Sequence, residues 1–80
     1  MIRYVWFDYN FDYVRFGSDV RKAREIAGLT QGQLADLTGH FENGQSLSAI
    51  EHGKVKLTVT SLLSLCNALD LDPRDYVTLF

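Results

Sequence analysis

Apolar and polar residues alternate at helical spacing in the middle of the chain, and the pattern predicts a short helix that begins after Thr30 and stops at Gly39. Leu34, Ala35 and Leu37 fall on one side of it and polar residues on the other. Threonine is a good N-cap, and glycine readily takes the left-handed conformation that ends a helix. The segment is therefore a short amphipathic helix.

A second short helix follows, and it too has apolar residues on one side and a glycine at its end. Leu47 and Ile50 point inward and Gly53 ends it. Helices of this length are not stable alone, so both must share a core with other helices and keep their polar faces outside.

Further helices are predicted on either side of this pair. Ser18 is the expected N-cap of the first helix, which carries Val20, Ala23 and Ala27 on one face and ends at Gly28.

Beyond the central pair, Thr58 is the expected cap of a fourth helix. Its predicted apolar stripe comprises Val59, Leu62, Leu63, Cys66 and Leu69. Asp72 followed by Pro73 then predicts a short fifth helix over residues 74–79.

The first sixteen residues differ from the rest because they are rich in aromatic and β-branched side chains. They predict strands near 2–7 and 12–16 with a bend at 8–11, although a continuous strand or a helix stays open. We therefore expect an aromatic β extension over residues 1–16 and a helical domain over 17–80, forming one compact domain overall.

Composition narrows the class of protein. Eighty residues, of which 46% are hydrophobic, make one globular domain. No apolar run is long enough to span a membrane and no leader pattern is seen, so we expect a cytoplasmic protein. One cysteine, expected to be buried, and two histidines assemble no disulfide framework or metal site. Because no nucleophile, base and oxyanion set is visible, we expect neither an enzyme nor a cofactor.

The net charge of −2 argues against a nucleic-acid partner, because Lys and Arg supply most of the affinity for phosphates. Its distribution is uneven, however. Basic residues lie in the middle of the chain, at Arg21, Lys22, Arg24, Lys54 and Lys56, and acidic ones gather near the end, at Asp70, Asp72 and Asp75.

From Phe16 to about Leu71 the sequence resembles the Cro and lambda-repressor-like helix-turn-helix family. The resemblance is carried by Arg24, by Leu-Thr-Gln-Gly-Gln-Leu-Ala at 29–35, by Ile-Glu-His-Gly at 50–53 and by the leucine-rich segment 62–69. Several motifs at the expected separations are more specific than any one of them. The resemblance implies a mainly α, five-helix domain whose third helix enters the major groove of DNA, here with an N-terminal β-strand or hairpin extension.

Two departures from the family pattern stand out. The chain holds about two residues more than is common between Gly39 and Glu51, which predicts an enlarged turn around 40–44. Leu57 stands where a proline is common.

The resemblance and the residue types together give a set of expected DNA-binding residues. The resemblance implies that Gln31 faces a phosphate. Side chains expected to meet base edges are Gln45, Ser46 and Ala49. Those expected to meet the sugar-phosphate backbone are Asn43, Gly44, His52, Lys54 and Lys56. In the resembled family a pair equivalent to Arg24 and Glu51 joins the first helix to the end of the third.

The sequence thus predicts a sequence-specific regulator of transcription, a dimeric repressor that binds double-stranded DNA at a two-fold operator. Residues 2–16 either pair two copies into a homodimer or fold back on the helices. An alternative is an antitoxin-like protein-interaction module that uses the aromatic segment and binds DNA weakly or not at all. No membrane partner is expected.

Overall fold

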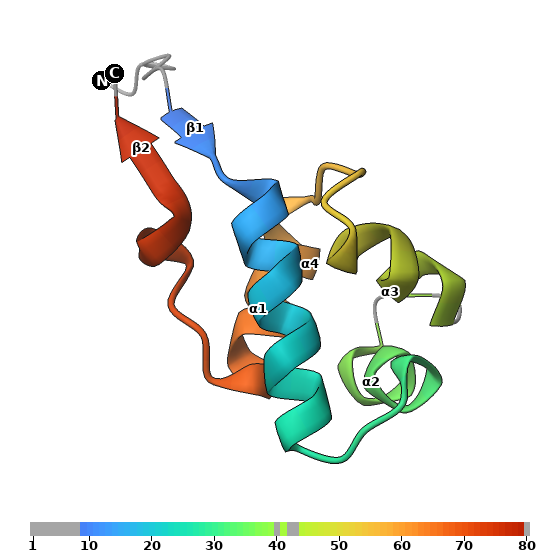
Figure 1. Ribbon diagram of the computed structural model, residues 1–80. Coiled ribbons are helices and arrows are strands. Elements are labelled where there is room, and N and C mark those ends of the chain that lie inside the picture. The colour runs from blue at the N-terminus through green and yellow to red at the C-terminus, as the bar shows by residue number, and fades with distance from the viewer. Residues whose placement is uncertain (1–8, 40, 42–43, 80) are drawn as a thin grey trace.

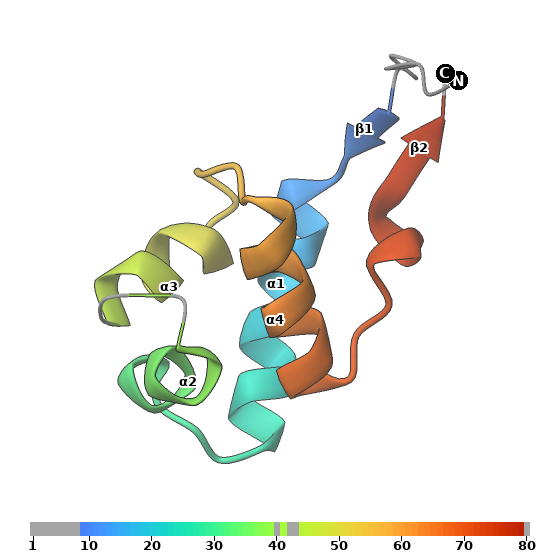
Figure 2. The same ribbon diagram turned by 180° about the vertical axis from the view of Figure 1, so that it is seen from behind.

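The computed structural model describes residues 9–39, 41 and 44–79, and these form four α-helices, one 3-10 helix and two short strands (Figure 1). In chain order they are β1 (Tyr9–Phe11), α1 (Tyr13–Ile26), α2 (Gln31–Thr38), α3 (Gly44–Glu51), α4 (Val59–Leu69), η1 (Pro73–Tyr76) and β2 (Val77–Leu79). Helices α1 and α4 lie at the centre, with α2 and α3 on one side and η1 on the other, as Figure 2 shows from behind. None of the helices within the described ranges is long and apolar enough to cross a membrane.

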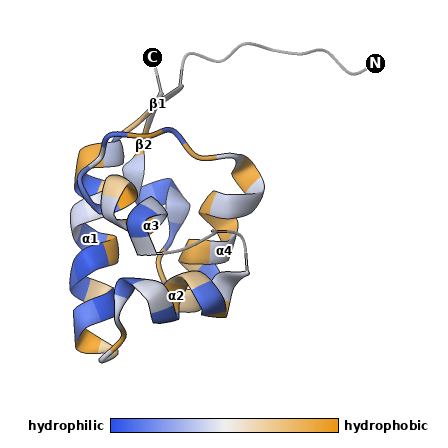
Figure 3. Ribbon diagram, turned by 90° about the vertical axis from the view of Figure 1, so that its right-hand side faces the viewer, coloured by the Kyte–Doolittle hydropathy of each residue, from blue (hydrophilic) through white to orange (hydrophobic). Residues whose placement is uncertain are grey.

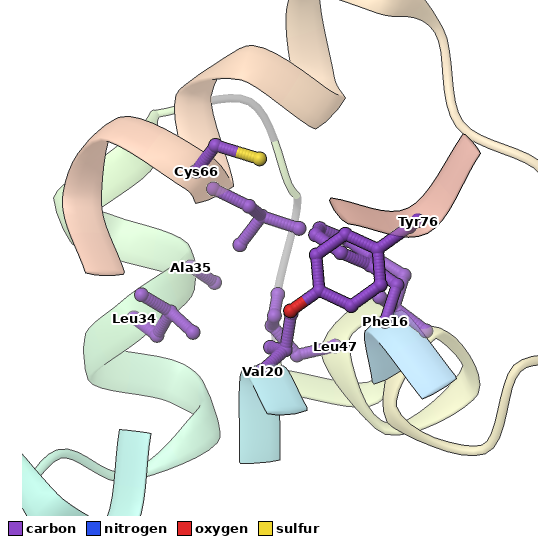
Figure 4. Packing of buried hydrophobic residues seen from close by; sticks show 9 residues of the cluster. Phe16, Val20, Leu34, Ala35, Leu47, Cys66 and Tyr76 are labelled. Atoms are coloured by element: carbon purple, nitrogen blue, oxygen red, sulfur yellow. The ribbon is translucent and has the colours of Figure 1, made fainter. Parts of the chain in front are cut away.

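All four α-helices contribute to one core (Figure 4). It consists of nine buried residues, namely Phe16, Val20, Leu34, Ala35, Leu47, Ile50, Leu65, Cys66 and Tyr76. Burying a large apolar side chain stabilises a fold by about 1.5–3 kcal/mol. Because α2 and α3 each supply a fully buried leucine, the two short helices are held by the core rather than by their own hydrogen bonds.

The predicted helix ends of the central region are confirmed. The Thr30 hydroxyl accepts from the backbone amide of Gln33, and the side-chain carbonyl of Gln33 accepts from the backbone amide of Thr30. The two bonds complete a capping box. Gly39 ends α2 with φ 70°, and Thr58 caps α4 through the Ser61 amide.

The start of the first helix was predicted wrongly. Its N-cap is Asp12, whose Oδ1 accepts from the Arg15 amide at 3.0 Å, and not Ser18. Residues 13–16 are therefore helical instead of forming the second strand of a hairpin, and α1 crosses the expected boundary between residues 16 and 17. Phe16 favours the helix because there its side chain is completely buried.

The predicted N-terminal hairpin is also wrong in its pairing. Residues 9–11, expected to bend, form β1, which pairs antiparallel with β2 so that Tyr9 lies opposite Leu79. The strand expected at 2–7 lies outside the described residues. The partner of β1 is thus at the other end of the sequence, and turn residues close to β1 could not indicate this pairing.

The fifth helix is reduced to a single 3-10 turn. Asp72 caps it and Pro73 begins it, as predicted, but from Val77 onward the chain is extended. Two tertiary contacts stop the helix here. The Asp12 amide donates to the Tyr76 carbonyl at 2.8 Å, and β2 pairs with β1.

Part of the predicted apolar stripe faces outward. Leu37 of α2 is 62% exposed, and Val59 and Leu63 of α4 are 71% and 49% exposed. The buried side of α4 is centred on Leu65 and Cys66. Helix α4 is apolar around much of its circumference (Figure 3), so the spacing of its apolar residues did not single out the inward face.

Candidate nucleic-acid interface

Helices α2 and α3 begin side by side and leave a shallow groove between their N-terminal turns. The groove is lined by Thr30, Gln31, Gly32, Gly44, Gln45 and Ser48. A Cβ atom added to Gly44 would lie 3.1 Å from the Gly32 amide nitrogen, so the two backbones are almost in contact. The first turns of both helices therefore border the same surface, and their partial positive charges favour an anion there.

Helix α3 is buried on one face and open on the other. Leu47, Ile50 and Glu51 point inward, while Gln45 at its start and His52 just past its end are exposed. Between these two, at helical spacing, lies the half-buried pair Ser48 and Ala49, and Ser46 lies at the side of this outer face.

Ser48 is a candidate that the sequence analysis missed. It borders the groove together with Gln45, and the i, i+3 spacing of these two residues was the signal that could have found it. The outer face of α3 is thus composed of small and amide side chains that leave room for a partner to approach closely.

One carboxylate ties the three helices of the site together. Glu51 is buried at the end of α3 and accepts from Arg24 of α1 in a bidentate pair, with Nε–Oε2 at 2.7 Å and Nη2–Oε1 at 3.2 Å. The third guanidinium nitrogen donates to the Leu29 carbonyl at 2.8 Å. This hydrogen bonding with Glu51 raises the pKa of Arg24, so the guanidinium stays charged.

Gln31 completes the same network at the start of α2. Its Nε2 donates to Glu51 Oε1 at 3.0 Å, and the residue borders the groove. An amide nitrogen carries two hydrogens, so this bond uses one and leaves the second for another acceptor. The structure therefore places Gln31 at the groove but bonded to the ion pair, an arrangement that the sequence did not predict.

The segment after α3 carries the expected basic residues. Gly53 has φ 69°, and the Lys54 amide donates to the Ala49 carbonyl at 3.1 Å, which turns the chain away from α3. His52 Nδ1 lies 2.7 Å from the Ser48 carbonyl oxygen, and Lys54 and Lys56 are exposed. The His52 ring and the Lys54 backbone therefore lie at the C-terminal end of the open face of α3.

Of the segment where an enlarged turn was expected, the structure describes Phe41 and Gly44. Phe41 is half-buried and packs against the core. Asn43, expected to meet a phosphate, lies outside the described residues, as do His40 and Glu42. In the part of the chain that the structure describes, no group of three or more His, Cys, Asp or Glu residues is arranged to hold a metal ion.

Residues 20–76 match the sequence profile of the helix-turn-helix family. The chain therefore belongs to the Cro and lambda-repressor-like helix-turn-helix family. None of the curated protein sequences is significantly similar to it.

Solved structures of regulators share the fold. The restriction-modification controller protein C.AhdI from Aeromonas hydrophila is 34% identical, with a TM-score of 0.67, and the match covers 80% of this chain and 90% of that protein. Two structures of the clp gene regulator ClgR from Corynebacterium glutamicum are each 26% identical, with TM-scores of 0.68 and 0.66. Both matches cover 82% of this chain, and they cover 68% and 83% of the two ClgR chains.

Proposed function

We propose that this protein is a sequence-specific DNA-binding regulator of transcription that inserts α3 into the major groove. The observation that carries the proposal is the way in which α3 is held against the other helices. Its inner face is buried and tied by Glu51 to α1 and α2, while its outer face lies open beside the N-terminal turn of α2. Such a helix can enter a groove without rearrangement.

Base edges are read by the outer face of α3. Gln45 is the main candidate, because its amide can both donate and accept in a bidentate contact with adenine. Ser46 and Ser48 hydrogen-bond to an acceptor or a donor, and the Ala49 methyl meets a thymine methyl.

The sugar-phosphate backbone is held on both sides of that face. On one side the first turn of α2, with the second amide hydrogen of Gln31, meets a phosphate together with Gly44 and Asn43 at the start of α3. On the other side His52, Lys54 and Lys56 follow the strand. The two lysines supply the salt-dependent part of the affinity.

The active form is a homodimer that represses by occupying a two-fold operator and excluding the polymerase. We place the dimer contact in residues 2–16, in the part that precedes α1, because Phe16 is buried in the core. In its favour, β1 is paired with β2 along one edge, and its other edge pairs with no strand among the described residues. The fold is shared with two proteins named as a controller and a gene regulator.

The test begins with selection of bound duplexes from a random library, followed by titration of the selected site and a scrambled duplex at several salt concentrations. Gln45→Ala should weaken binding to the selected site by about 1–3 kcal/mol and reduce discrimination at one base pair. Asn67→Ala, which removes an exposed amide from α4 on another part of the surface, is the matched control and should bind like the wild type.

The result that contradicts the proposal is equally concrete. If no duplex is enriched, or if affinity is independent of salt and of Gln45, the protein is not a DNA-binding regulator. The protein-interaction alternative then takes its place.

A further inference from the structure

The C-terminal end of α3 lies directly on the first turns of α1, and a glycine makes this possible. Gly17 is buried inside α1. A Cβ atom added there would overlap the carbonyl oxygen of Ile50 and lie 2.9 Å from that of Glu51. Both opposing atoms belong to the backbone of α3, so no side chain can rotate away to relieve the overlap.

A second glycine makes the same contact from the other side. Gly53, just past α3, faces α1, and a Cβ atom added to it would lie 2.7 Å from the Cα of Val14. Val14 and Gly17 are three residues apart and so share one face of α1. The end of α3 is therefore held against α1 by two backbone contacts, each of which requires the absence of a side chain.

Helix propensity alone would not select glycine at position 17. In a helix interior glycine is less favourable than alanine by about 0.5–1 kcal/mol. The close approach of α3 provides the reason for it. The same contact brings Glu51 within reach of Arg24, because Glu51 is one of the residues whose carbonyl rests on Gly17.

We propose that Gly17 and Gly53 are positioning residues that set the angle of α3, and through it the discrimination between operator and other DNA. This inference rests on the function proposed above. A side chain at either position moves the C-terminal end of α3 away from α1, while the N-terminal end stays fixed by the contact of Gly44 with Gly32. The helix then tilts, and Gln45, Ser48 and Ala49 no longer meet base edges together.

The experiment compares alanine variants at four positions, each titrated with the selected operator and a scrambled duplex at a temperature where it is fully folded. Gly17→Ala is paired with Ser18→Ala, its exposed neighbour in α1. Gly53→Ala is paired with Gly28→Ala, because both glycines have positive φ, 69° and 75°, but a Cβ at Gly28 meets nothing within 4 Å. The second pair thus separates backbone strain from contact with α1.

Gly17→Ala and Gly53→Ala should each lose about tenfold or more in operator affinity, the scale of one lost base contact. Their affinity for scrambled DNA, which depends on charge, should change little. Ser18→Ala and Gly28→Ala, the two controls, should keep the wild-type ratio of operator affinity to scrambled-duplex affinity. An unchanged ratio of operator to scrambled affinity in either glycine variant overturns the proposal for that position, and if Gly17→Ala does not fold, Gly53→Ala decides alone.

A readout without DNA keeps this inference separate from the proposed function. In Gly17→Ala, a tilted α3 shifts the backbone amide resonances along the whole helix, from Gln45 to Glu51. A local effect would be confined to residues 50 and 51 and would count against the proposal. If the wild type enriches no duplex, the proposed function fails, while this measurement still tests whether the glycines position α3.

Discussion

Glu51 is the one charged residue that is buried among those the structure describes, and the site depends on it. Its carboxylate accepts from Arg24 and from Gln31, so a single side chain connects α1, α2 and α3. Taking a carboxylate out of water is costly, and only a close, fully hydrogen-bonded partner offsets that cost.

Replacing this carboxylate should therefore destabilise the whole protein. Glu51→Ala leaves the Arg24 guanidinium, which is only 13% exposed, without its partner. We expect the free energy of unfolding, measured by urea denaturation, to fall by about 3–5 kcal/mol. DNA affinity should fall as well.

The chain offers a matched control in α1, the helix that carries Arg24. Glu25 pairs with Arg21 at 3.4 Å, and both side chains are more than half exposed. Glu25→Ala should change the stability by less than about 1 kcal/mol. Equal effects of the two substitutions would show that the burial of Glu51 does not matter.

The sequence predicted these residues unevenly. The pairing of Arg24 with Glu51 was expected because the resemblance to the helix-turn-helix family implied it. The bond from Gln31 to Glu51 was not expected, since sequence spacing does not tell which acceptor a flexible amide chooses. Ser48 was overlooked although its helical spacing from Gln45 was available.

At the scale of elements, the end of the chain is held to α1 by Tyr76. Its ring packs edge-on against Phe16, and its hydroxyl donates to Asp19 Oδ2 at 2.7 Å. The Arg15 guanidinium lies over the Tyr76 ring, with its central carbon 5.2 Å from the ring centroid. Burial, and then the bond to Asp19, raise the pKa of Tyr76 from 10.0 to about 12.

This shift predicts a loss of stability at alkaline pH. In the unfolded chain the phenol ionises near pH 10, but in the folded protein it stays protonated until about pH 12. The contribution is therefore complete below pH 10 and is lost as the pH rises toward 12, on the order of 2–3 kcal/mol in all. Urea denaturation across this range measures it.

The matching variant is Tyr76→Phe, which keeps the ring but cannot ionise. It should be less stable than the wild type at neutral pH by about 1 kcal/mol, because one hydrogen bond is lost. Between pH 10 and 12 its stability should fall less steeply than that of the wild type. Parallel curves would mean that Tyr76 does not titrate as described.

The helix ends and strands show which features the sequence pattern could predict and which it could not. The caps at Thr30 and Thr58 and the end at Gly39 were predicted correctly because each depends on bonds to neighbouring residues. The start of α1 and the last residues of the chain were not. The last residues depend on the pairing of β1 with β2, between residues almost seventy positions apart in sequence. The Asp12 cap of α1 is local, but aromatic and β-branched residues on both sides of it favoured strands and concealed it.

At the scale of the whole molecule, the proposed dimer can be separated from the fold. Phe11 packs against the core and Asp12 caps α1, so a deletion must stop before them. Removing residues 1–8 should leave the helical circular dichroism spectrum unchanged and shift the equilibrium from dimer toward monomer in sedimentation equilibrium, because only the edge of β1 is then left for the contact. Operator affinity should fall because two half-sites are no longer bound together.

The control for this deletion is the full-length chain at the same concentrations. A truncated protein that dimerises as tightly as the full-length chain would remove residues 1–8 from the dimer contact. A full-length protein that is monomeric at every concentration would remove the dimer from the proposal altogether.

The antiparallel pairing of β1 with β2 also determines how the molecule responds to mechanical force. Tyr9 lies opposite Leu79 at the end of the ribbon away from the helices (Figure 1), so tension applied to these two residues peels the strands apart one hydrogen bond at a time instead of shearing them together. The next resistance comes from the bond between Asp12 and Tyr76, and then from that between Tyr76 and Asp19. An optical trap should therefore record an early, low-force extension in which the four α-helices stay intact, followed by a separate rupture.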